Sequence, residues 1–255
     1  MRILLSFLFL LCFHAEAQLL INPYAFASAP ASTLNNNLVG YWKLDEASGQ
    51  RNDSSGTSHL TDNNTVTQAA GKVGNAAQFT RANSESLSVA DPAALSMGDI
   101  DFTLAAWVYL DSTANSIMVL CKGDLGASTY EYMIRFSSSA VLFETRMGNG
   151  VVNLTRQATT FGAPSTATWY LIIAWHDATA NTVNICVNNG TVDSSSLLTG
   201  SYDSAYSFVM GNSSAGTTYY WDGRIDEVGI WKRVLTAGER TELYNAGSGK
   251  TCCPF

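Results

Sequence analysis

Charged side chains recur at alternate positions in neighbouring segments near the middle of the chain. One segment carries Glu131 and Arg135, the next carries Glu144 and Arg146, and Asn153 follows on a third. A period of two places such residues on one face of a strand, so we expect them to share a sheet face, with each glutamate close to an arginine. Paired carboxylate and guanidinium groups can bond the hydroxyls of a sugar. They can equally form a solvated cross-strand ladder, at about 0.2–1 kcal/mol per pair.

Carboxylate pairs able to hydrolyse a glycosidic bond are not predicted. Retaining enzymes hold two carboxyl groups about 5–5.5 Å apart across the bond. The adjacent pairs Asp226–Glu227 and Asp45–Glu46 would point to opposite faces of a strand. The two glutamates of the charged segments face arginines, which lower a carboxyl pKa, whereas a general acid needs a raised one. The chain also lacks GxSxG, HExxH and the dinucleotide-binding glycine fingerprint, so we expect no enzyme.

Composition and charge exclude other classes. Of the 255 residues, 46% are hydrophobic and 14% charged, which is the composition of a folded chain. The net charge of −7 and the absence of any Lys or Arg run argue against nucleic acid, whose phosphates need a basic surface.

The first residues have the pattern of a cleaved signal peptide over 1–17. Arg2 precedes an apolar run over 3–13, and Ala15-Glu16-Ala17 matches a small-x-small cleavage site. About eleven apolar residues are too few to span ~30 Å of hydrocarbon, so we expect a secreted protein without a membrane span. Residues 18–37 are small and polar, typical of a leader, and residues 38–255 are expected to form one domain.

Four cysteines would remain after cleavage, and export permits disulfides. Cys252 and Cys253 could cross-link chains, whereas Cys121 and Cys186 lie in apolar segments. Three pairings are open, and buried free thiols are an equal alternative.

The elements that position these groups are predicted to be almost all strands. About a dozen apolar or alternating segments are separated by Gly, Asn and Ser, as in an antiparallel β-sandwich. Residues 169–175 are apolar on both faces, as a covered central strand would be. Thr236 and Glu239 form a capping box for one short helix that Gly247 ends. Three tryptophans are expected between sheets about 10 Å apart: Trp42, Trp107 and Trp231.

Five ordered motifs carry a family resemblance. They are VGYWKLDEASGQRNDSSG (39–56), GKVGNAAQF (71–79), DFTLAAWVYL (101–110), ICVNNG (185–190) and YWDGRIDEVGIWKRVLTAGE (220–239). Together they resemble the laminin-G-like domains of the concanavalin A-like lectin/glucanase superfamily. The resemblance implies an all-β, two-sheet antiparallel jelly-roll β-sandwich with one short C-terminal helix.

The resemblance also implies a Ca²⁺ site, since laminin-G-like domains commonly bind one ion through loop oxygens. The loop over 45–62 is rich in oxygen ligands, and the resemblance sets Asp226 near it. We therefore expect Asp53 and Asp226, with Asp45 and Glu46, to hold the ion. The same loop residues are also common turn formers and caps.

The function expected from these features is recognition. The chain is predicted to be a secreted, non-catalytic module that binds a glycan or an extracellular or cell-surface protein. The charged face is the expected ligand site, and four tyrosines of later loops could stack on sugars: Tyr202, Tyr206, Tyr219 and Tyr220. The alternatives are an adhesive component of a surface layer or virus-particle fibre and a divergent glycoside hydrolase.

Overall fold

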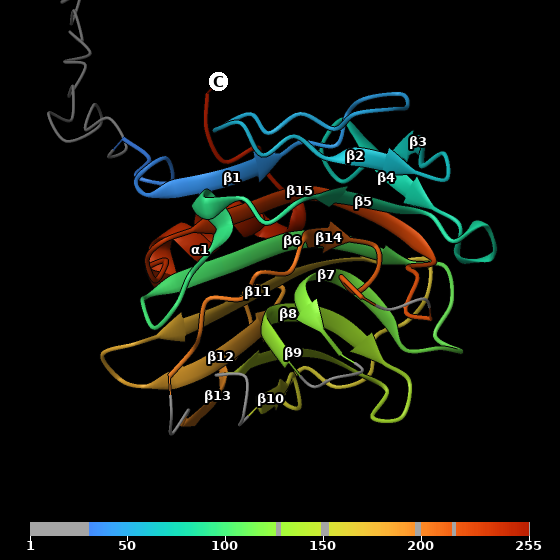
Figure 1. The fold of residues 1–255 in the computed structure, drawn as a ribbon. Helices are drawn as coiled ribbons and strands as arrows, with labels where there is room; N and C mark the ends of the chain where they lie inside the picture. The colour runs from blue at the N-terminus through green and yellow to red at the C-terminus, as the bar shows by residue number, and fades with distance from the viewer. Residues whose placement is uncertain (1–30, 126–128, 149–152, 197–199, 216–217, 255) are drawn as a thin grey trace, which may run out of the picture. The chain divides into compact units, whose positions relative to one another are not determined.

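Two antiparallel sheets form the fold, as expected from the alternating segments (Figure 1). The computed structural model describes residues 31–125, 129–148, 153–196, 200–215 and 218–254. One compact unit runs from Ser32 to Phe255. The all-β sandwich class is confirmed.

The eight-stranded sheet contains most of the long strands. Its order is β13 (Asp193–Ser196), β12 (Thr182–Val187), β11 (Trp169–Asp177), β6 (Phe102–Leu110), β15 (Gly223–Trp231), β4 (Asn75–Phe79) and β3 (Thr67–Ala70), with β1 (Leu38–Trp42) also paired to β15. The central position of β11, between β12 and β6, explains why residues 169–175 are apolar on both faces.

The seven-stranded sheet carries the charged segments. Its order is β10 (Asn153–Gln157), β9 (Leu142–Gly148), β8 (Thr129–Ser137), β7 (Ile117–Asp124), β14 (Phe208–Met210), β5 (Ser86–Val89) and β2 (Thr61–Asn63). Short 3₁₀ helices span Arg81–Asn83, Ala93–Leu95 and Asn245–Gly247.

Among the described residues, no helix has the length and apolar character that crossing a membrane requires.

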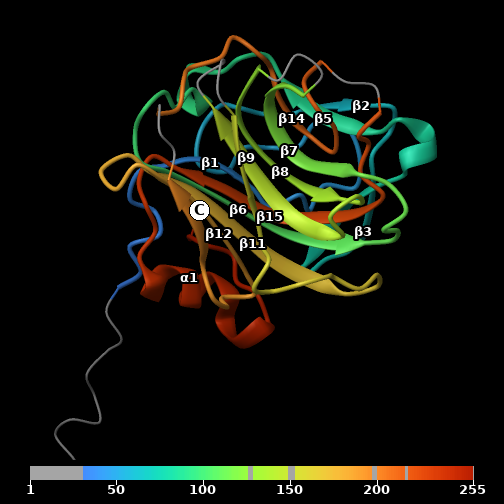
Figure 2. The same cartoon turned by 90° about the horizontal axis from the view of Figure 1, so that it is seen from below.

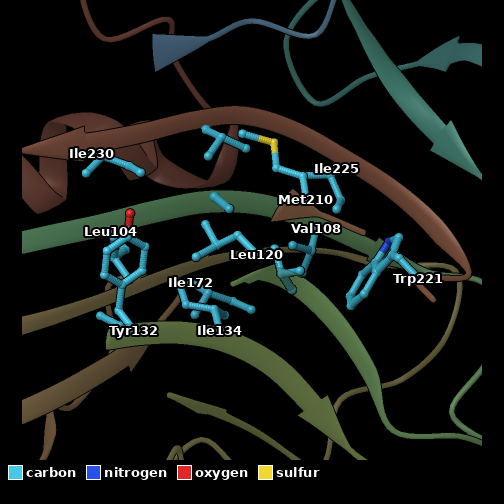
Figure 3. Packing of buried hydrophobic residues seen from close by; sticks show 14 of the residues in the cluster. Leu104, Val108, Leu120, Tyr132, Ile134, Ile172, Met210, Trp221, Ile225 and Ile230 are labelled. Carbon is cyan, nitrogen blue, oxygen red and sulfur yellow. The ribbon is translucent and has the colours of Figure 1, made fainter. Parts of the chain in front are cut away.

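The inner faces of the two sheets meet in the main core, shown in Figure 3. Leu104, Ile172 and Ile230 come from the eight-stranded sheet, and Leu120 and Ile134 from the seven-stranded one. The period of two sends every second side chain into this layer, and burial of that apolar surface is the main force holding the sheets together.

A second apolar cluster covers the outer face of the eight-stranded sheet. Trp107 and Trp231 lie in it, together with Leu34 and Cys252, so their expected place between the sheets is wrong, while Trp42 does lie there. Trp107 alternates with the inward-facing Ala106 and Val108, and therefore points outward. Figure 2 shows α1 (Ala237–Tyr244) on this side of the sheet, away from β7, β8 and β9.

The last residues of the expected leader pack on the domain. The indole Nε1 of Trp231 donates to the carbonyl of Leu34 at 2.6 Å, and the Leu34 side chain is fully buried. Arg233 donates to the carbonyls of Thr33 and Asn36. Residues 32–37 therefore belong to the folded unit.

Thr33 and Arg233 both contact the cap of α1. Thr236 and Glu239 form the expected capping box, and Arg233 binds both Glu239 oxygens at 2.7 Å. The helix ends at Tyr244, earlier than Gly247, because Asn245 adopts the left-handed conformation with φ 47°. The Arg233 hydrogen bonds, aided by Thr33 and Thr236, lower the pKa of Glu239 to about 2.

The Glu239 carboxylate should make the free energy of unfolding depend on pH below 4.5. Its pKa is about 2 in the folded chain against an ordinary 4.5, so its contribution is present above pH 4.5 and is lost as the pH falls toward 2. Urea unfolding of Glu239→Gln and the parent chain should therefore give free energies that converge over this window. A difference that stays constant from pH 5 to pH 2 would contradict the assignment.

Candidate functional site

A network of charged side chains joins β8, β9 and β10 on the outer face of the seven-stranded sheet. Arg135 lies opposite Glu144, and Glu144 opposite Gln157. Glu144 Oε1 accepts from Arg135 Nε at 2.6 Å and from Arg146 Nε at 3.0 Å. Glu144 Oε2 accepts from Gln157 Nε2 at 3.1 Å. The predicted glutamate–arginine pairing is thus confirmed for these strands.

The network is buried at Glu144 and Arg135 and partly exposed at Arg146. Glu144 is 1% exposed and Arg135 8%, whereas the Arg146 side chain is 24% exposed. A buried carboxylate with two guanidinium partners and an amide holds their side chains in fixed positions. The two arginines are therefore oriented before any ligand arrives.

Apolar and aromatic groups lie beside the charged network. Met118, Cys121 and Met133 form a small outer cluster against which Tyr219 packs. The Arg135 guanidinium carbon lies 6.0 Å from the centre of the Tyr219 ring, within cation–π range. Met118, Cys121 and Met133 are fully buried, whereas Tyr219 is half-buried, so the Tyr219 ring is the part of this cluster that is open to a ligand.

Glu131 does not belong to this face, and its expected grouping with Arg135 is wrong. The pairing of β7 with β8 shifts register between Lys122 and Gly123, so Glu131 is an extra residue in a β-bulge. The alternation is broken there, and Tyr130 joins the outer cluster instead. Glu131 is fully buried.

Lys122 is the partner of Glu131, which sequence reasoning missed. Its ammonium lies 2.8 Å from Glu131 and 2.9 Å from Asp91, and it also donates to the carbonyl of Ser204. Glu131 further accepts from the backbone of Met97 and Ser204. Burial opposes the charge of Lys122, but the hydrogen bonds to the two carboxylates outweigh it, and its pKa is raised. The sequence signal was a lysine inside the apolar segment 117–122.

Asn153 begins β10, opposite Gly148 in the register. Its strand position is on the expected face, and its side chain lies outside the described residues.

Asp53, a predicted calcium ligand, is bonded to backbone amides. Its Oδ1 accepts from the amides of Tyr41, Ser55 and Gly56, each at 3.0 Å, and its Oδ2 accepts from the amide of Ser58 at 3.1 Å. The side chain is 4% exposed. Asp53 therefore acts as the cap of the 53–58 turn.

Asp45 and Asp226 hold a different turn, the one between β3 and β4. Asp226 Oδ2 accepts from the amides of Lys72 at 2.7 Å and Val73 at 2.9 Å, and Asp45 Oδ1 accepts from Asn75 at 2.7 Å. Asp226 Oδ1 is buried without a hydrogen-bond partner. Burial, with the nearby Asp45 charge, raises the pKa of Asp226 to about 7.

The four predicted ligands do not fit a Ca²⁺ site as a set. Glu46 accepts from the amide and side chain of Asn52, and Asp53 and Asp226 serve separate turns. Within the described ranges, no three His, Cys, Asp or Glu side chains are grouped so that they could hold a metal. Calcium needs six to eight oxygens, and only Asp45 and Asp226 of the predicted set come together.

The adjacent carboxyls of Asp226 and Glu227 share a face, contrary to expectation. Asp226 pairs with the outward-facing Trp107, and a register shift follows before Gly229. At this bulge Glu227 has φ 48° and accepts from Thr251 in the C-terminal segment at 3.0 Å. Burial raises the pKa of Glu227 to about 7. A glycosidic bond cannot lie between them, because Asp226 is 0% exposed and Glu227 5%.

The described cysteines are buried free thiols. Cys121 lies in the outer cluster beside Met133, and Cys186, Cys252 and Cys253 lie in the second apolar cluster. Burial raises the pKa of Cys121 to about 12 and that of Cys186 to about 11, so these thiols are poor nucleophiles.

Solved structures share this fold at low sequence identity. The binding domain of Paraclostridial Mosquitocidal Protein 1 aligns with a TM-score of 0.68 and 17% identity over 84% of this chain and 53% of that one. Domain 4 of AbnA, a GH43 extracellular arabinanase from Geobacillus stearothermophilus, in complex with arabinotriose, aligns at 0.62 and 18% over 81% and 97%. The botulinum neurotoxin serotype G binding domain aligns at 0.60 and 14% over 83% and 51%. This chain therefore spans about half of each toxin binding region and nearly all of the arabinanase domain.

The sequence itself places the chain in a family. A comparison with curated proteins finds no relative. Residues 81–239, more than half of the chain, match Laminin_G_3, the concanavalin A-like lectin/glucanases superfamily. The match covers the strands of the charged network and ends at the capping box of α1. The chain thus belongs to the Laminin_G_3 family of the concanavalin A-like lectin/glucanases superfamily.

Proposed function

We propose that this chain is a non-catalytic recognition module that binds a glycan on the outer face of β8, β9 and β10. The observation that carries the proposal is the oriented network of Arg135, Glu144, Arg146 and Gln157, with Tyr219 packed beside Arg135. Guanidinium, carboxylate and amide groups bond sugar hydroxyls, and an aromatic ring packs on the apolar face of a sugar.

The arrangement of the two outer faces supports this location. The eight-stranded sheet is covered by α1, residues 32–37 and the C-terminal segment through the second apolar cluster. The seven-stranded sheet instead presents half-buried polar side chains on β9 and β10, among them Arg146 and Gln157. Polar groups that are fixed yet reach solvent are available to a ligand.

The solved relatives are consistent with recognition as the role. One is described in complex with arabinotriose, and the others are toxin binding domains. Since the shared feature at this identity is the fold, which hosts many activities, the proposal rests on the charged network. We further propose that the module acts outside the cell, on the strength of the signal-like residues 1–17, and that the glycan is bound without Ca²⁺, because Asp53 and Asp226 already serve separate turns.

A glycan array tests the proposal. The parent chain should bind a limited set of glycans, and Arg135→Ala and Arg146→Ala should each weaken binding about tenfold or more, as loss of a charged hydrogen bond does. Lys232→Ala is the matched control, since Lys232 follows β15 beside β1, on the other sheet. Melting curves of all variants check the fold. A blank array, or glycan binding that both arginine variants retain, would contradict the proposal.

A further inference from the structure

We infer that the ligand of the charged network carries an anionic group, so that the preferred glycan is an acidic one. This inference rests on the proposed function and adds the chemical class of the ligand. It starts from the balance of charge on the face: Arg135 and Arg146 both bind the single carboxylate of Glu144. The network therefore holds one positive charge in excess.

Two charged side chains near the network have ion-pair partners of their own. Arg156 lies on β10, the strand that also carries Gln157, and it is paired with Asp193 at 3.1 Å. Glu131, which sequence reasoning placed beside Arg135, lies in the buried cluster with Lys122 at 2.8 Å. The one carboxylate in contact with the two arginines, among the described residues, is Glu144.

Glu144 contacts only some of the nitrogens of each guanidinium group. Arg135 contacts Glu144 through Nε, and its two terminal nitrogens have no hydrogen-bond partner among the described residues. Arg146 Nε and Nη2 both lie 3.0 Å from the same Glu144 oxygen, and Nη1 makes no hydrogen bond to another of the described residues. The Arg135 side chain is 9% exposed and the Arg146 side chain 24%, so solvent reaches part of each.

Two such groups on adjacent strands suit an anion. Arg135 is nine-tenths buried, and a partly buried guanidinium with free donors binds a planar or tetrahedral oxyanion through two parallel hydrogen bonds. The side chains are already fixed by Glu144, so little rotational freedom is lost on binding. Carboxylates of uronic or sialic acids and sulfate esters share this chemistry.

Matched pairs of polysaccharide probes test the inference by calorimetry on the full chain. One pair is oligogalacturonate and its methyl ester, and the other is dextran sulfate and dextran. In at least one pair the charged member should bind about 10- to 100-fold more tightly, the range expected for a charged hydrogen bond, and added salt should weaken it. The pair that shows the preference identifies the anion as carboxylate or sulfate.

Charge-matched variants separate the network from the net charge of the protein. Arg146→Gln should abolish the preference for the charged member, while Lys232→Gln, which removes the same charge elsewhere, should keep it. If uncharged members bind as tightly as charged ones, if no probe binds, or if Arg146→Gln retains the preference, the inference is overturned. If the array shows glycan binding, the proposed function still holds when this inference fails. An array without any binding would contradict the proposed function itself.

Discussion

Replacing Lys122 by Met should lower the free energy of unfolding by about 3–5 kcal/mol, the usual cost of removing one partner from a buried ion pair. Lys122 and Glu131 are both fully buried, 2.8 Å apart. Without the ammonium, the Glu131 carboxylate would keep its bonds to the amides of Met97 and Ser204 but lose its counter-charge. The bulge that places Glu131 there joins the loops at 91–97 and 201–204 to the sheet, so the substitution should destabilise both loops.

Urea unfolding measures this effect, and a second variant isolates its cause. The double variant Lys122→Met with Glu131→Gln should recover part of the loss, because the neutral side chain needs no counter-charge and its amide oxygen still accepts from a buried backbone amide of Met97 or Ser204. Lys232→Met, a lysine outside the buried cluster, should change stability by about 0.5 kcal/mol or less. A Lys122→Met loss under about 1 kcal/mol would contradict the assignment of this pair.

Replacing Asp53 by Ala should lower the free energy of unfolding by about 2–5 kcal/mol. The substitution leaves the amides of Tyr41 and Ser58 without the carboxylate, and both bonds are buried. A buried donor without a partner costs about 1–3 kcal/mol, and the amides of Ser55 and Gly56 lose their partner as well. The large effect follows from a turn cap, with no ion involved.

Thermal melts with calcium and with chelator separate the cap from a metal ligand. The melting temperature of the parent chain should not change on chelation, and Asp53→Ala should lower it equally in both conditions. Asp45→Ala, which removes an exposed carboxylate bonded to the amide of Asn75, should have a smaller effect. A parent chain that loses stability on chelation, with the Asp53→Ala loss confined to calcium buffer, would restore the calcium interpretation.

The parts of the fold that follow from side-chain periodicity could be predicted from the sequence. Alternation correctly placed Arg135, Glu144 and Arg146 on one sheet face, and the capping box correctly predicted the start of α1 after Thr236. These signals are local, so one segment contains all the information needed. Three short strands were missed, β2, β3 and β13, because they contain few residues that favour strands and form strands only by pairing with a neighbour.

The errors concentrate at two bulges. At Glu131 and at Glu227 an extra residue reverses the alternation, so the side chain moves to the other face of the sheet. A bulge is decided by the pairing of distant strands, and neither segment contains a residue pattern that marks it. The same limit explains Lys122, whose burial depends on Asp91 and Ser204 from remote loops.

The site itself was predictable only in part. The spacing of Glu144 and Arg146, with Arg135 on the preceding strand, correctly indicated an ion-paired face. That Gln157 completes the network depends on the register of β9 and β10, which sequence alone does not set. The contact of Tyr219 with Arg135 joins residues from distant parts of the sequence, so it could be found only in the folded chain.

The claim that the outer face of β8, β9 and β10 is the ligand site is tested most directly by amide NMR during a titration with the tightest glycan from the array. The account predicts that shifts concentrate around Arg135, Glu144, Arg146 and Gln157 and at Tyr219, and that Arg146→Gln suppresses them. Shifts that concentrate instead around α1 or the turn between β3 and β4, with these strands unchanged, would contradict it.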